Sequence, residues 1–427
     1  MITRETAFTM DTSSIKYGAG TTREVGYDMA QLGVKRVMLV TDPNMSNHEA
    51  VQIAMQSLAD ADIDAVKFDQ TRIEPTDVSF KEAIAFAVDG NFDGFVAVGG
   101  GSSIDTAKVA NLYATYPTDD FLDYVNQPLG NGKAIPGKLK PLIAIPTTAG
   151  TGSETTSVAV FDLLEKEVKT GISHRVMRPV LGILDPLNTA TMPPLVAASS
   201  GLDVLSHAIE SLTAIPFNQK QAVDHPSKRP PYQGSNPISD IWSENSIQIV
   251  SRYIRRAMTD NDDLEARGQM MLAASYAGIG FGNAGVHLPH AMSYPVAGMV
   301  RDYHPADYNV PWAMAPHGIA VIVNAPAVFR WTAVTDPQRH LRAAQLLGVD
   351  IRNADEADAG DLLAEALIEI MKDTGSPNGL QALGFTEADV DQLAEGAFAQ
   401  QRLTKLSPRP ASRDDFKQLF RDAMRYW

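Results

Sequence analysis

The chain has 427 residues, of which 44% are hydrophobic and 20% charged, so it can form a large core and lies outside the composition range of disordered proteins. Its formal net charge of −15 argues against a role in binding nucleic acid or an anionic membrane. Because cysteine is absent, disulfide scaffolds, Cys-ligated metal sites and thiol nucleophiles are excluded, and any metal must be held mainly by His, Asp or Glu.

The opening segment MITRETAFTMDTSSIKYG has no apolar stretch of the kind found in a signal peptide. Residues 318–329, the most apolar late stretch, are too short to span a bilayer. Together with the missing cysteines, these features predict a soluble protein of a reducing or redox-neutral compartment, most simply the cytoplasm.

Short β-branched runs alternate with helical patterns in the first half of the chain, which is typical of a parallel sheet built from βαβ units. Strands are expected at residues 36–41, 95–98, 142–145 and 181–184. After Pro186 the hydrophobic period becomes helical, and helices are expected at residues 195–214, 239–259, 264–280 and 361–374. The patterns predict an α/β domain over residues 1–187 and an all-α domain over residues 188–427, which a proline-rich loop at 216–237 interrupts.

Two glycine-containing turns are expected where strands end. In residues 99–108 (GGGSSIDTAK), three glycines allow a ligand to approach the backbone, and Ser102 or Ser103 can cap the following helix. Residues 146–154 (PTTAGTGSE) follow another strand and are rich in hydroxyl groups. One such turn fits a plain strand-to-helix connection equally well, but two of them at the same edge of a sheet predict a phosphate or nucleotide site.

A second group of polar residues indicates a metal site. Asp203 and His207 are one helical turn apart, so they can hold one ion between them. Four of the nine histidines fall between positions 287 and 317, and His290 and His317 stand in otherwise apolar segments. One Asp with two or three His suits Fe(II) or Zn(II) equally well. The alternative is a set of separately buried, hydrogen-bonded histidines.

These motifs, in this order, resemble those of the iron-containing alcohol dehydrogenases. The matching segments are GGGSSIDTAK, PTTAGTGSE, LDP at Leu184, GLDVLSHAIES at Gly201, the segment around His290 and PHG at residues 316–318. The resemblance implies a dinucleotide-binding α/β domain, a helical domain and a catalytic divalent metal in the cleft between them. It places the metal ligands at Asp203, His207, His290 and His317, and treats His287 as a residue of the cleft that is not a ligand.

The same resemblance implies an NAD site. The residues expected to form it are Asp42, Gly99, Gly100, Gly101, Ser102, Ser103, Asp105, Thr147, Thr148, Thr151, Lys169 and Leu184. Asp42 closes the strand at 36–41, where a carboxylate can accept hydrogen bonds from ribose hydroxyls and repel a 2′-phosphate. An Asp that only caps a turn is the alternative interpretation.

A narrower resemblance covers almost the whole chain, from FTMDTSSIKYGAGTTREVG near the start to QRLTKLSPRP near the end. These segments are similar to the hydroxyacid-oxoacid transhydrogenase branch of the family. The resemblance implies that hydride passes through NAD from 4-hydroxybutyrate to 2-oxoglutarate, giving succinate semialdehyde and 2-hydroxyglutarate. No transit peptide is seen, which fits a bacterial homologue. Tyr294 stands where many family members have a histidine, so Tyr294 or His287 is expected to replace that histidine in proton transfer.

Both expected substrates are anions, so the site needs a local cation. The candidates are Arg301, His287, Lys220, Lys228 and Arg229. An ordinary NAD-dependent dehydrogenase that releases its cofactor is the main alternative to a transhydrogenase. A sugar-phosphate cyclase of the lyase type and a non-catalytic metal or nucleotide binder are further alternatives. We expect a homo-oligomer that acts on small acids.

Overall fold

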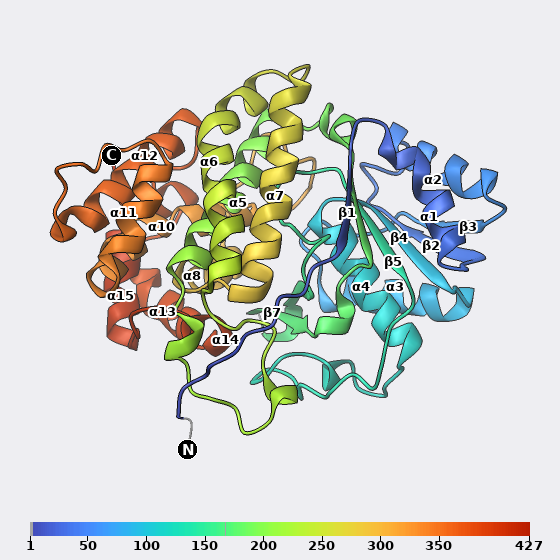
Figure 1. Cartoon of the computed structure of the whole chain (residues 1–427), viewed down its shortest axis with the longest axis horizontal. Helices are drawn as coiled ribbons and strands as arrows, with labels where there is room; N and C mark the ends of the chain where they lie inside the picture. Colours follow the sequence, from blue (N-terminus) through green and yellow to red (C-terminus); the bar gives the residue numbers. More distant parts are fainter. Residues whose placement is uncertain (1–2, 167) are drawn as a thin grey trace. The chain divides into compact units, whose positions relative to one another are not determined.

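The computed structural model describes residues 3–166 and 168–427, which form two compact units (Figure 1). Asp11–Met192 form one unit, called here the α/β unit. Pro193–Trp427 form the other, the helical unit, together with the N-terminal segment that ends at Met10. The sequence places the boundary between residues 187 and 188, slightly earlier than the end of the α/β unit in the structure.

A six-stranded parallel sheet forms the centre of the α/β unit, with strand order β1-β8-β5-β4-β2-β3. Its strands are β1 (Ser14–Tyr17), β2 (Arg36–Val40), β3 (Asp64–Phe68), β4 (Gly94–Gly99), β5 (Leu142–Pro146) and β8 (Leu181–Leu184). Every residue of β4 and β5 is buried, as expected for central strands that are covered on both faces.

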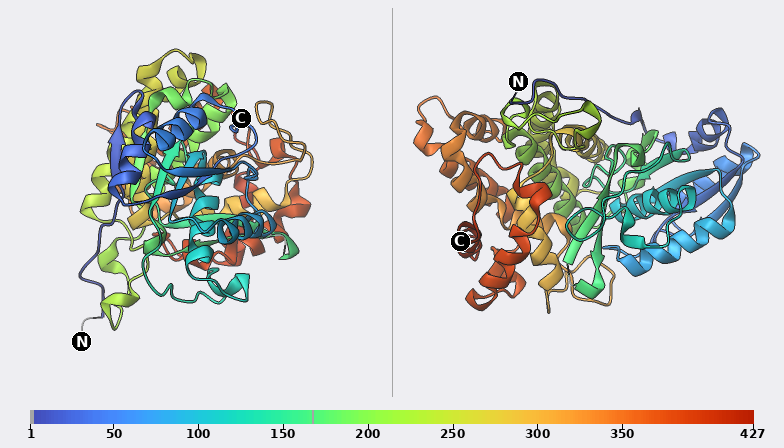
Figure 2. Two further views of the ribbon diagram at one scale, coloured as in Figure 1. Left: turned by 90° about the vertical axis from the view of Figure 1, so that its right-hand side faces the viewer. Right: turned by 90° about the horizontal axis from the view of Figure 1, so that it is seen from below.

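Helices cover both faces of this sheet (Figures 1 and 2). They are α1 (Val25–Gln31), α2 (Glu49–Asp60), α3 (Asp77–Gly90) and α4 (Gly101–Thr115). Side chains of α1 and α2 pack with Val96 and Val98 of β4, whereas those of α3 and α4 pack with Phe95 and Ala97. Since successive residues of a strand point to opposite faces, the two pairs of helices lie on opposite sides of the sheet.

An antiparallel hairpin adds a second, smaller sheet to the α/β unit. It consists of β6 (Val158–Leu163) and β7 (Val168–Ser173) and was not expected from the sequence. Phe161 of the hairpin packs in one cluster with Phe80 of α3 and with Val109 and Leu112 of α4. The hairpin therefore extends the core beyond the edge of the parallel sheet.

The helical unit contains no multi-residue strand within its described residues. Its helices are α5 (Pro194–Thr213), α6 (Pro237–Thr259), α7 (Leu264–Ala284), α8 (Leu288–Met299), α9 (His317–Ile322), α10 (Ala325–Thr332), α11 (Pro337–Leu346), α12 (Ala359–Asp373), α13 (Val390–Phe398), α14 (Gln401–Thr404) and α15 (Arg413–Asp422). Helix α5 is buried almost throughout its length between its neighbours. The expected fold class, an α/β domain followed by a helical one, is confirmed.

The expected loop at 216–237 is irregular apart from two short 3-10 helices, Phe217–Gln219 and Pro226–Lys228. The side chain of Asn236 caps the N-terminus of α6, which begins at Pro237. Residues 317–335 form a helical stretch long and apolar enough to cross a membrane, and 78% of its apolar window is buried within the fold. Such burial is what the core helix of a folded domain shows.

Candidate metal centre and glycine turns

Four side chains of the helical unit meet in one cluster, called here the Asp/His cluster. Asp203 and His207 lie on α5, His290 on α8, and His317 is the first residue of α9. One ligand atom from each lies within 4.8 Å of the others. The Oδ1 atom of Asp203 is 3.8 Å from His207 Nδ1, 3.6 Å from His290 Nε2 and 3.9 Å from His317 Nε2.

These distances are too long for hydrogen bonds but suit ligands of a shared ion. Two atoms that are each about 2.1 Å from one ion are at most about 4.2 Å apart, and all three distances from Asp203 fall below that limit. Within the described chain, Asp203 Oδ1, His207 Nδ1 and His290 Nε2 are buried without a hydrogen-bond partner. Because unmet buried polar atoms are costly, the cluster fits one divalent cation.

The protonation states of two cluster residues agree with this assignment. Burial lowers the pKa of His207 to about 3, so its ring is neutral near pH 7, as a metal ligand must be. Burial alone would raise the pKa of Asp203, but the neighbouring histidines, His207 foremost, lower it to about 2. Asp203 is therefore ionised and supplies the negative charge of the cluster.

Glu210 supports the cluster from behind and was not identified in the sequence. It is fully buried on α5, and its Oε1 accepts a hydrogen bond from His290 Nδ1 at 2.5 Å. With the proton held on Nδ1, the Nε2 atom of His290 is left facing Asp203. Burial would lower the pKa of His290, but Glu210 and Asp203 raise it to about 9. The signal in the sequence was the position of Glu210 on the same helical face as Asp203 and His207.

Close helix contacts hold the cluster residues in place. A Cβ atom at Gly318 would lie only 1.9 Å from the carbonyl oxygen of Ser199 on α5, so only glycine lets α9 approach so closely. This approach brings His317 to Asp203 and explains the glycine of the PHG segment. The ring of His207 stacks on Phe281 of α7 with centroids 3.9 Å apart.

His287 is enclosed and does not reach solvent. Its backbone N–H donates to Glu210 Oε2 at 2.6 Å, its Nε2 lies 3.0 Å from Thr213 Oγ1, and its ring contacts Phe329. The residue is 0% exposed, and burial lowers its pKa to about 4. A neutral, enclosed ring cannot supply the positive charge that we expected of it for a substrate carboxylate. The expectation that His287 is a residue of the cleft and not a metal ligand stays a prediction, and His287 is not one of the four residues of the Asp/His cluster.

Tyr294 lies on α8, one helical turn after His290. The side chain is 4% exposed, and its hydroxyl accepts a hydrogen bond from Arg402 Nη2 at 3.4 Å. Residues four apart on a helix share a face, so Tyr294 lies on the same face as His290.

The first glycine turn lies between β4 and α4. Gly99 ends the strand, Gly100 is the N-cap residue, and Gly101 starts the helix. The expectation that Ser102 or Ser103 caps this helix is wrong, because only Gly100 separates strand from helix and the two serines already lie in the first helical turn. The free N–H groups of that turn remain a feature suited to an anion.

The second glycine turn lies against the first one. The N–H of Thr147 donates to the carbonyl of Gly99 at 3.0 Å. A Cβ atom at Gly100 would lie 3.4 Å from Thr148 Oγ1, and one at Gly101 would lie 2.6 Å from Thr151 Cγ2. The structure thus brings together the two turns that the sequence placed at one edge of the sheet.

Both carboxylate oxygens of Asp105 accept hydrogen bonds from other residues of the α/β unit. Its Oδ1 accepts from Ser153 Oγ at 2.5 Å, and its Oδ2 accepts from the N–H of Val160 at 2.9 Å. Lys108, which is 0% exposed, donates to Ser153 Oγ at 2.6 Å and to the carbonyl of Val158 at 2.8 Å. Burial lowers the pKa of Lys108. Asp105 therefore connects α4 to the second turn and to the hairpin.

Three other residues expected at the NAD site have structural partners. Asp42 Oδ1 accepts from the backbone N–H groups of Asn44 and Met45 at 2.9 and 3.2 Å, which is the turn-capping role, and burial raises its pKa. Lys169 Nζ forms ion pairs with carboxylates of Glu74 and Asp162 at 2.7 and 3.1 Å. The side chain of Leu184 is buried in β8.

The cations considered for a substrate carboxylate all have partners. Arg301 pairs with Asp389 at 2.8 Å, and Lys228 pairs with Asp224 at 2.8 Å. Arg229 forms two hydrogen bonds to Glu5, at 3.0 and 3.1 Å. Lys220 donates to the carbonyl of Tyr232 at 3.1 Å, and burial lowers its pKa to about 8.

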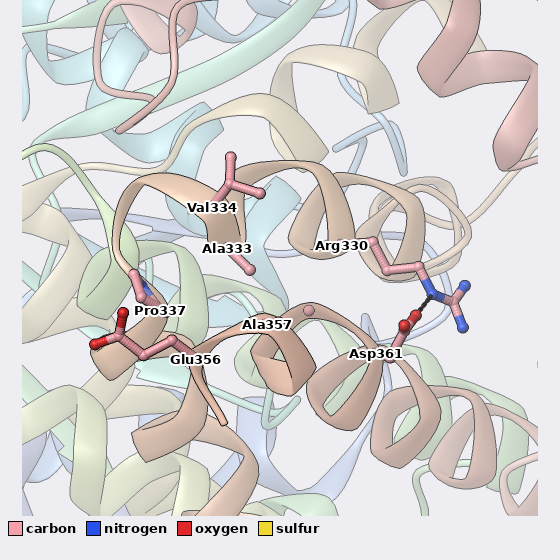
Figure 3. A pocket seen from close by; sticks show the side chains of 8 residues that line it. Arg330, Ala333, Val334, Pro337, Glu356, Ala357 and Asp361 are labelled. Carbon is pink, nitrogen blue, oxygen red and sulfur yellow. Dashed lines mark hydrogen bonds and ion pairs between the residues drawn. The ribbon is translucent and has the colours of Figure 1, made fainter. Parts of the chain in front are cut away.

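A surface pocket of the helical unit lies between α10, α11 and α12 (Figure 3). The Arg330 guanidinium at its rim pairs with Asp361 at 2.8 Å. None of the residues expected to act in catalysis or binding lines this pocket, so it has no part in the site described above.

Sequence comparison identifies the family. The model of the iron-containing alcohol dehydrogenases matches residues 12–186, and the model of the C-terminal region of Fe-containing alcohol dehydrogenases matches residues 232–424. The chain belongs to the iron-containing alcohol dehydrogenase family. It is therefore an oxidoreductase, and it has an Asp/His metal cluster of this family.

Individual relatives are similar over the full length. The chain is 52% identical over 426 residues to the mitochondrial hydroxyacid-oxoacid transhydrogenase of Bos taurus, covering 100% of this chain and 91% of that protein. The human protein of the same name is 51% identical with the same coverage. A crystal structure of 1,3-propanediol oxidoreductase superposes with a TM-score of 0.85 at 28% identity, covering 98% of this chain and 100% of that one.

The comparisons confirm the expected family and the expected full-length similarity to hydroxyacid-oxoacid transhydrogenases. They contradict the expectation of a cytoplasmic protein, because relatives at about half identity are mitochondrial. Receptors recognise a targeting segment when they direct a protein to an organelle, and the composition of the folded domains does not encode that destination. The absence of cysteine therefore could not predict the compartment.

Proposed function

We propose that this protein transfers hydride through NAD between a hydroxyacid and an oxoacid. The donor is 4-hydroxybutyrate and the acceptor is 2-oxoglutarate, and the products are succinate semialdehyde and 2-hydroxyglutarate. The observation that carries the proposal is the similarity to hydroxyacid-oxoacid transhydrogenases, which extends over 426 residues and therefore includes both units.

Asp203, His207, His290 and His317 would hold one divalent cation, Fe²⁺ or Zn²⁺. When bound, such an ion polarises the substrate oxygen and lowers the pKa of the hydroxyl group. Asp203 contributes the only negative charge among these four residues, and Glu210 keeps the ring of His290 turned with Nε2 toward Asp203. Binding would displace the proton that Glu210 and Asp203 favour on His290, because a histidine binds a metal in its neutral form. With one carboxylate among the four ligands, the loaded site would keep a net positive charge, which favours a negatively charged substrate oxygen.

The two glycine turns would hold NAD, which accepts hydride from the donor carbon and returns it to the acceptor. The N–H groups at the start of α4 suit its pyrophosphate, and Gly100 has room in front of it because the nearest side chain is 3.4 Å from a Cβ built there. Asp42 lies beside the same turn, since its Oδ2 is 3.7 Å from a Cβ built at Gly99. With Oδ1 engaged in the turn, Oδ2 is the oxygen that would bind the ribose.

Tyr294 is the better placed of the two residues considered for proton transfer. Its hydroxyl lies on the same helical face as His290 and is bound by Arg402. His287 acts on the site indirectly, because its backbone N–H holds Glu210. A homo-oligomer that acts on small acids, and not on nucleic acid or membranes, stays a prediction.

The test is to mix purified protein with 4-hydroxybutyrate and 2-oxoglutarate and to add no nicotinamide. We expect equal amounts of succinate semialdehyde and 2-hydroxyglutarate, and parallel double-reciprocal plots, since one substrate leaves before the other enters. An ordinary dehydrogenase would instead require added NAD, release NADH and show no stimulation by 2-oxoglutarate. That outcome would overturn the transhydrogenase proposal and leave the metal site in place.

A further inference from the structure

Arg402 is a half-buried arginine of α14 that no role described so far uses. It belongs to the segment QRLTKLSPRP. Its guanidinium carbon lies 5.1 Å from the centre of the Tyr232 ring, and its Nη2 donates to the Tyr294 hydroxyl at 3.4 Å. Two aromatic side chains from distant parts of the sequence, the loop at 216–237 and helix α8, thus contact one guanidinium.

The guanidinium of Arg402 has no ionic partner. Its Nη1 is shielded from solvent and donates no hydrogen bond to any described residue. Across residues 3–166 and 168–427 it forms no ion pair, and the groups that raise its pKa are the two tyrosines and no carboxylate. A shielded guanidinium N–H group is normally paired, because a polar group that loses water without gaining a partner is destabilising. The missing partner is an anion, and a carboxylate matches the paired N–H groups best.

The surroundings hold Arg402 in this position. A Cβ atom at Gly285 would lie 2.4 Å from Leu406 Cδ1 and 3.0 Å from Tyr232 Cβ, so the segment after α14 and the loop at 216–237 pack tightly against the C-terminal end of α7. The N–H of Ile215 donates to the carbonyl of Leu406 at 2.8 Å. Arg402 is therefore fixed on a rigid support, as a residue that orients a ligand should be.

The position of Arg402 relates it to the Asp/His cluster through α8. Arg402 bonds to Tyr294, and Tyr294 is one helical turn, about 5.4 Å along the axis, from the cluster residue His290. Arg402 thus bonds to a side chain on the face of α8 that also carries the cluster residue His290. We infer that Arg402 binds the carboxylate of the hydroxyacid and oxoacid substrates, an inference that rests on the proposed function.

This assignment also explains why the cations chosen from the sequence are poor candidates. Arg301, Lys228 and Arg229 already pair with carboxylates of the protein, and His287 is neutral and enclosed. Arg402 differs from the three paired cations in having no ion pair among the described residues, whereas Lys220 already donates to the carbonyl of Tyr232 at 3.1 Å. A substrate without a carboxylate would leave it unpaired, so Arg402 would favour acids over neutral alcohols by the cost of that unmet charge.

The test compares 4-hydroxybutyrate with 1-butanol, which has the same carbon chain but no carboxylate, in wild type and Arg402→Met. We expect the ratio of kcat/KM for 4-hydroxybutyrate to kcat/KM for 1-butanol to fall about 10- to 100-fold in the variant, mostly through KM for the acid. Activity on the alcohol in the same preparation shows that the variant folds. Arg402→Lys keeps the charge without the paired N–H groups and should retain part of the acid activity.

Binding without turnover gives a second readout. We expect 2-oxoglutarate to raise the Tm of the wild type and not that of Arg402→Met. Arg413→Met is the matched control, since Arg413 also stacks on a ring, Phe398, but is 55% exposed and paired with Glu395. It should behave as wild type in both assays.

The inference is overturned if Arg402→Met keeps its kcat/KM for 4-hydroxybutyrate, or if it loses activity on both substrates equally, because a merely structural residue would do so. Failure of the proposed function shows itself differently, in the wild type. The wild type would then oxidise 1-butanol but no hydroxyacid, and 2-oxoglutarate would not raise its Tm.

Discussion

The Asp/His cluster and the two glycine turns differ in what completes them. In the cluster, Asp203, His207 and His290 each keep a buried polar atom without a partner. In the turns, the backbone and side chains bond mainly to one another, through Thr147 to Gly99 and through Asp105 to Ser153. The buried polar atoms of the cluster therefore need an ion as their partner, whereas the polar groups of the turns find many of their partners within the protein.

This difference predicts two kinds of response to mutation. Changes in the cluster should alter metal content, stability and activity together, because metal binding there contributes to folding free energy. Changes in the turns should affect stability and cofactor affinity separately. Gly101 leaves room for the side chain of Thr151, whereas Gly100 is the position at which we expect the cofactor to approach the backbone.

The largest effect is expected from alanine variants of Asp203, His207, His290 and His317. Each should lose bound metal and about 1000-fold or more in activity, because the alanine removes one metal bond and leaves a space where that ligand was, in a site built for four protein ligands. Metal content by mass spectrometry, measured beside turnover, checks this. His287→Ala is the control and should keep its metal, because the contact of His287 with Glu210 runs through the backbone N–H. A His290→Ala protein with a full metal complement would refute the cluster as the metal site.

A smaller effect is expected for Glu210→Gln. The amide still fits the space but no longer offers a charge to His290 Nδ1, so metal affinity should fall about 10- to 100-fold. Competition with a chelator measures the dissociation constant. Glu244→Gln, which affects a surface pair with Arg342, should leave the affinity as in the wild type. If both variants behave alike, Glu210 does not act on the metal through His290.

The glycine turns allow a comparison of two adjacent positions. A Cβ at Gly101 meets the Thr151 side chain at 2.6 Å, so Gly101→Ala should lower the free energy of unfolding by about 1–3 kcal/mol. Gly100 has a φ of −74° and only ordinary contacts around it, and serine is a favoured N-cap, so Gly100→Ser should leave stability unchanged and weaken NAD binding. Denaturant titrations with and without NAD separate the two effects. Equal loss of stability in both would contradict the distinction.

The smallest effect concerns pH and lies outside both sites. Burial lowers the pKa of Lys220 from 10.5 to about 8, so between these values the unfolded chain binds more protons than the folded one. The free energy of unfolding should therefore rise with pH across this window, by about 1–3 kcal/mol. Lys220→Met should abolish the rise, and Lys228→Met, at a residue that is 64% exposed, should retain it. Parallel curves for both variants would contradict the burial effect.

The sequence predicted most reliably those strands in which every residue is buried. Strands β4 and β5 were found because every residue in them is buried and apolar. Strand β1, with three of its four residues exposed, gave no such signal, and β3 is mostly of intermediate exposure. The hairpin of β6 and β7 was missed because its burial comes from contacts with α3 and α4 that are made only in the folded chain.

In the site, too, contacts between residues far apart in the sequence could not be predicted. Asp203 and His207 follow from helical spacing, and His290 and His317 follow from histidines in apolar segments. Glu210 and Arg402 were missed because their partners, His290 and Tyr294, lie 80 and 108 residues away in the sequence. The oxygens of Asp105 bond to Ser153 and Val160, 48 and 55 residues away, contacts that the sequence also did not reveal; its place at the NAD site stays a prediction.

The central claim is that hydride passes between two acids through a cofactor held by this protein. The most direct test uses 4-hydroxybutyrate with deuterium on the hydroxyl-bearing carbon, unlabelled 2-oxoglutarate, ordinary water and no added nicotinamide. We predict 2-hydroxyglutarate that carries deuterium at carbon 2, because the label moves only from donor to bound NAD and on to the acceptor. Absence of deuterated 2-hydroxyglutarate, with succinate semialdehyde formed only when NAD is supplied, would contradict the account.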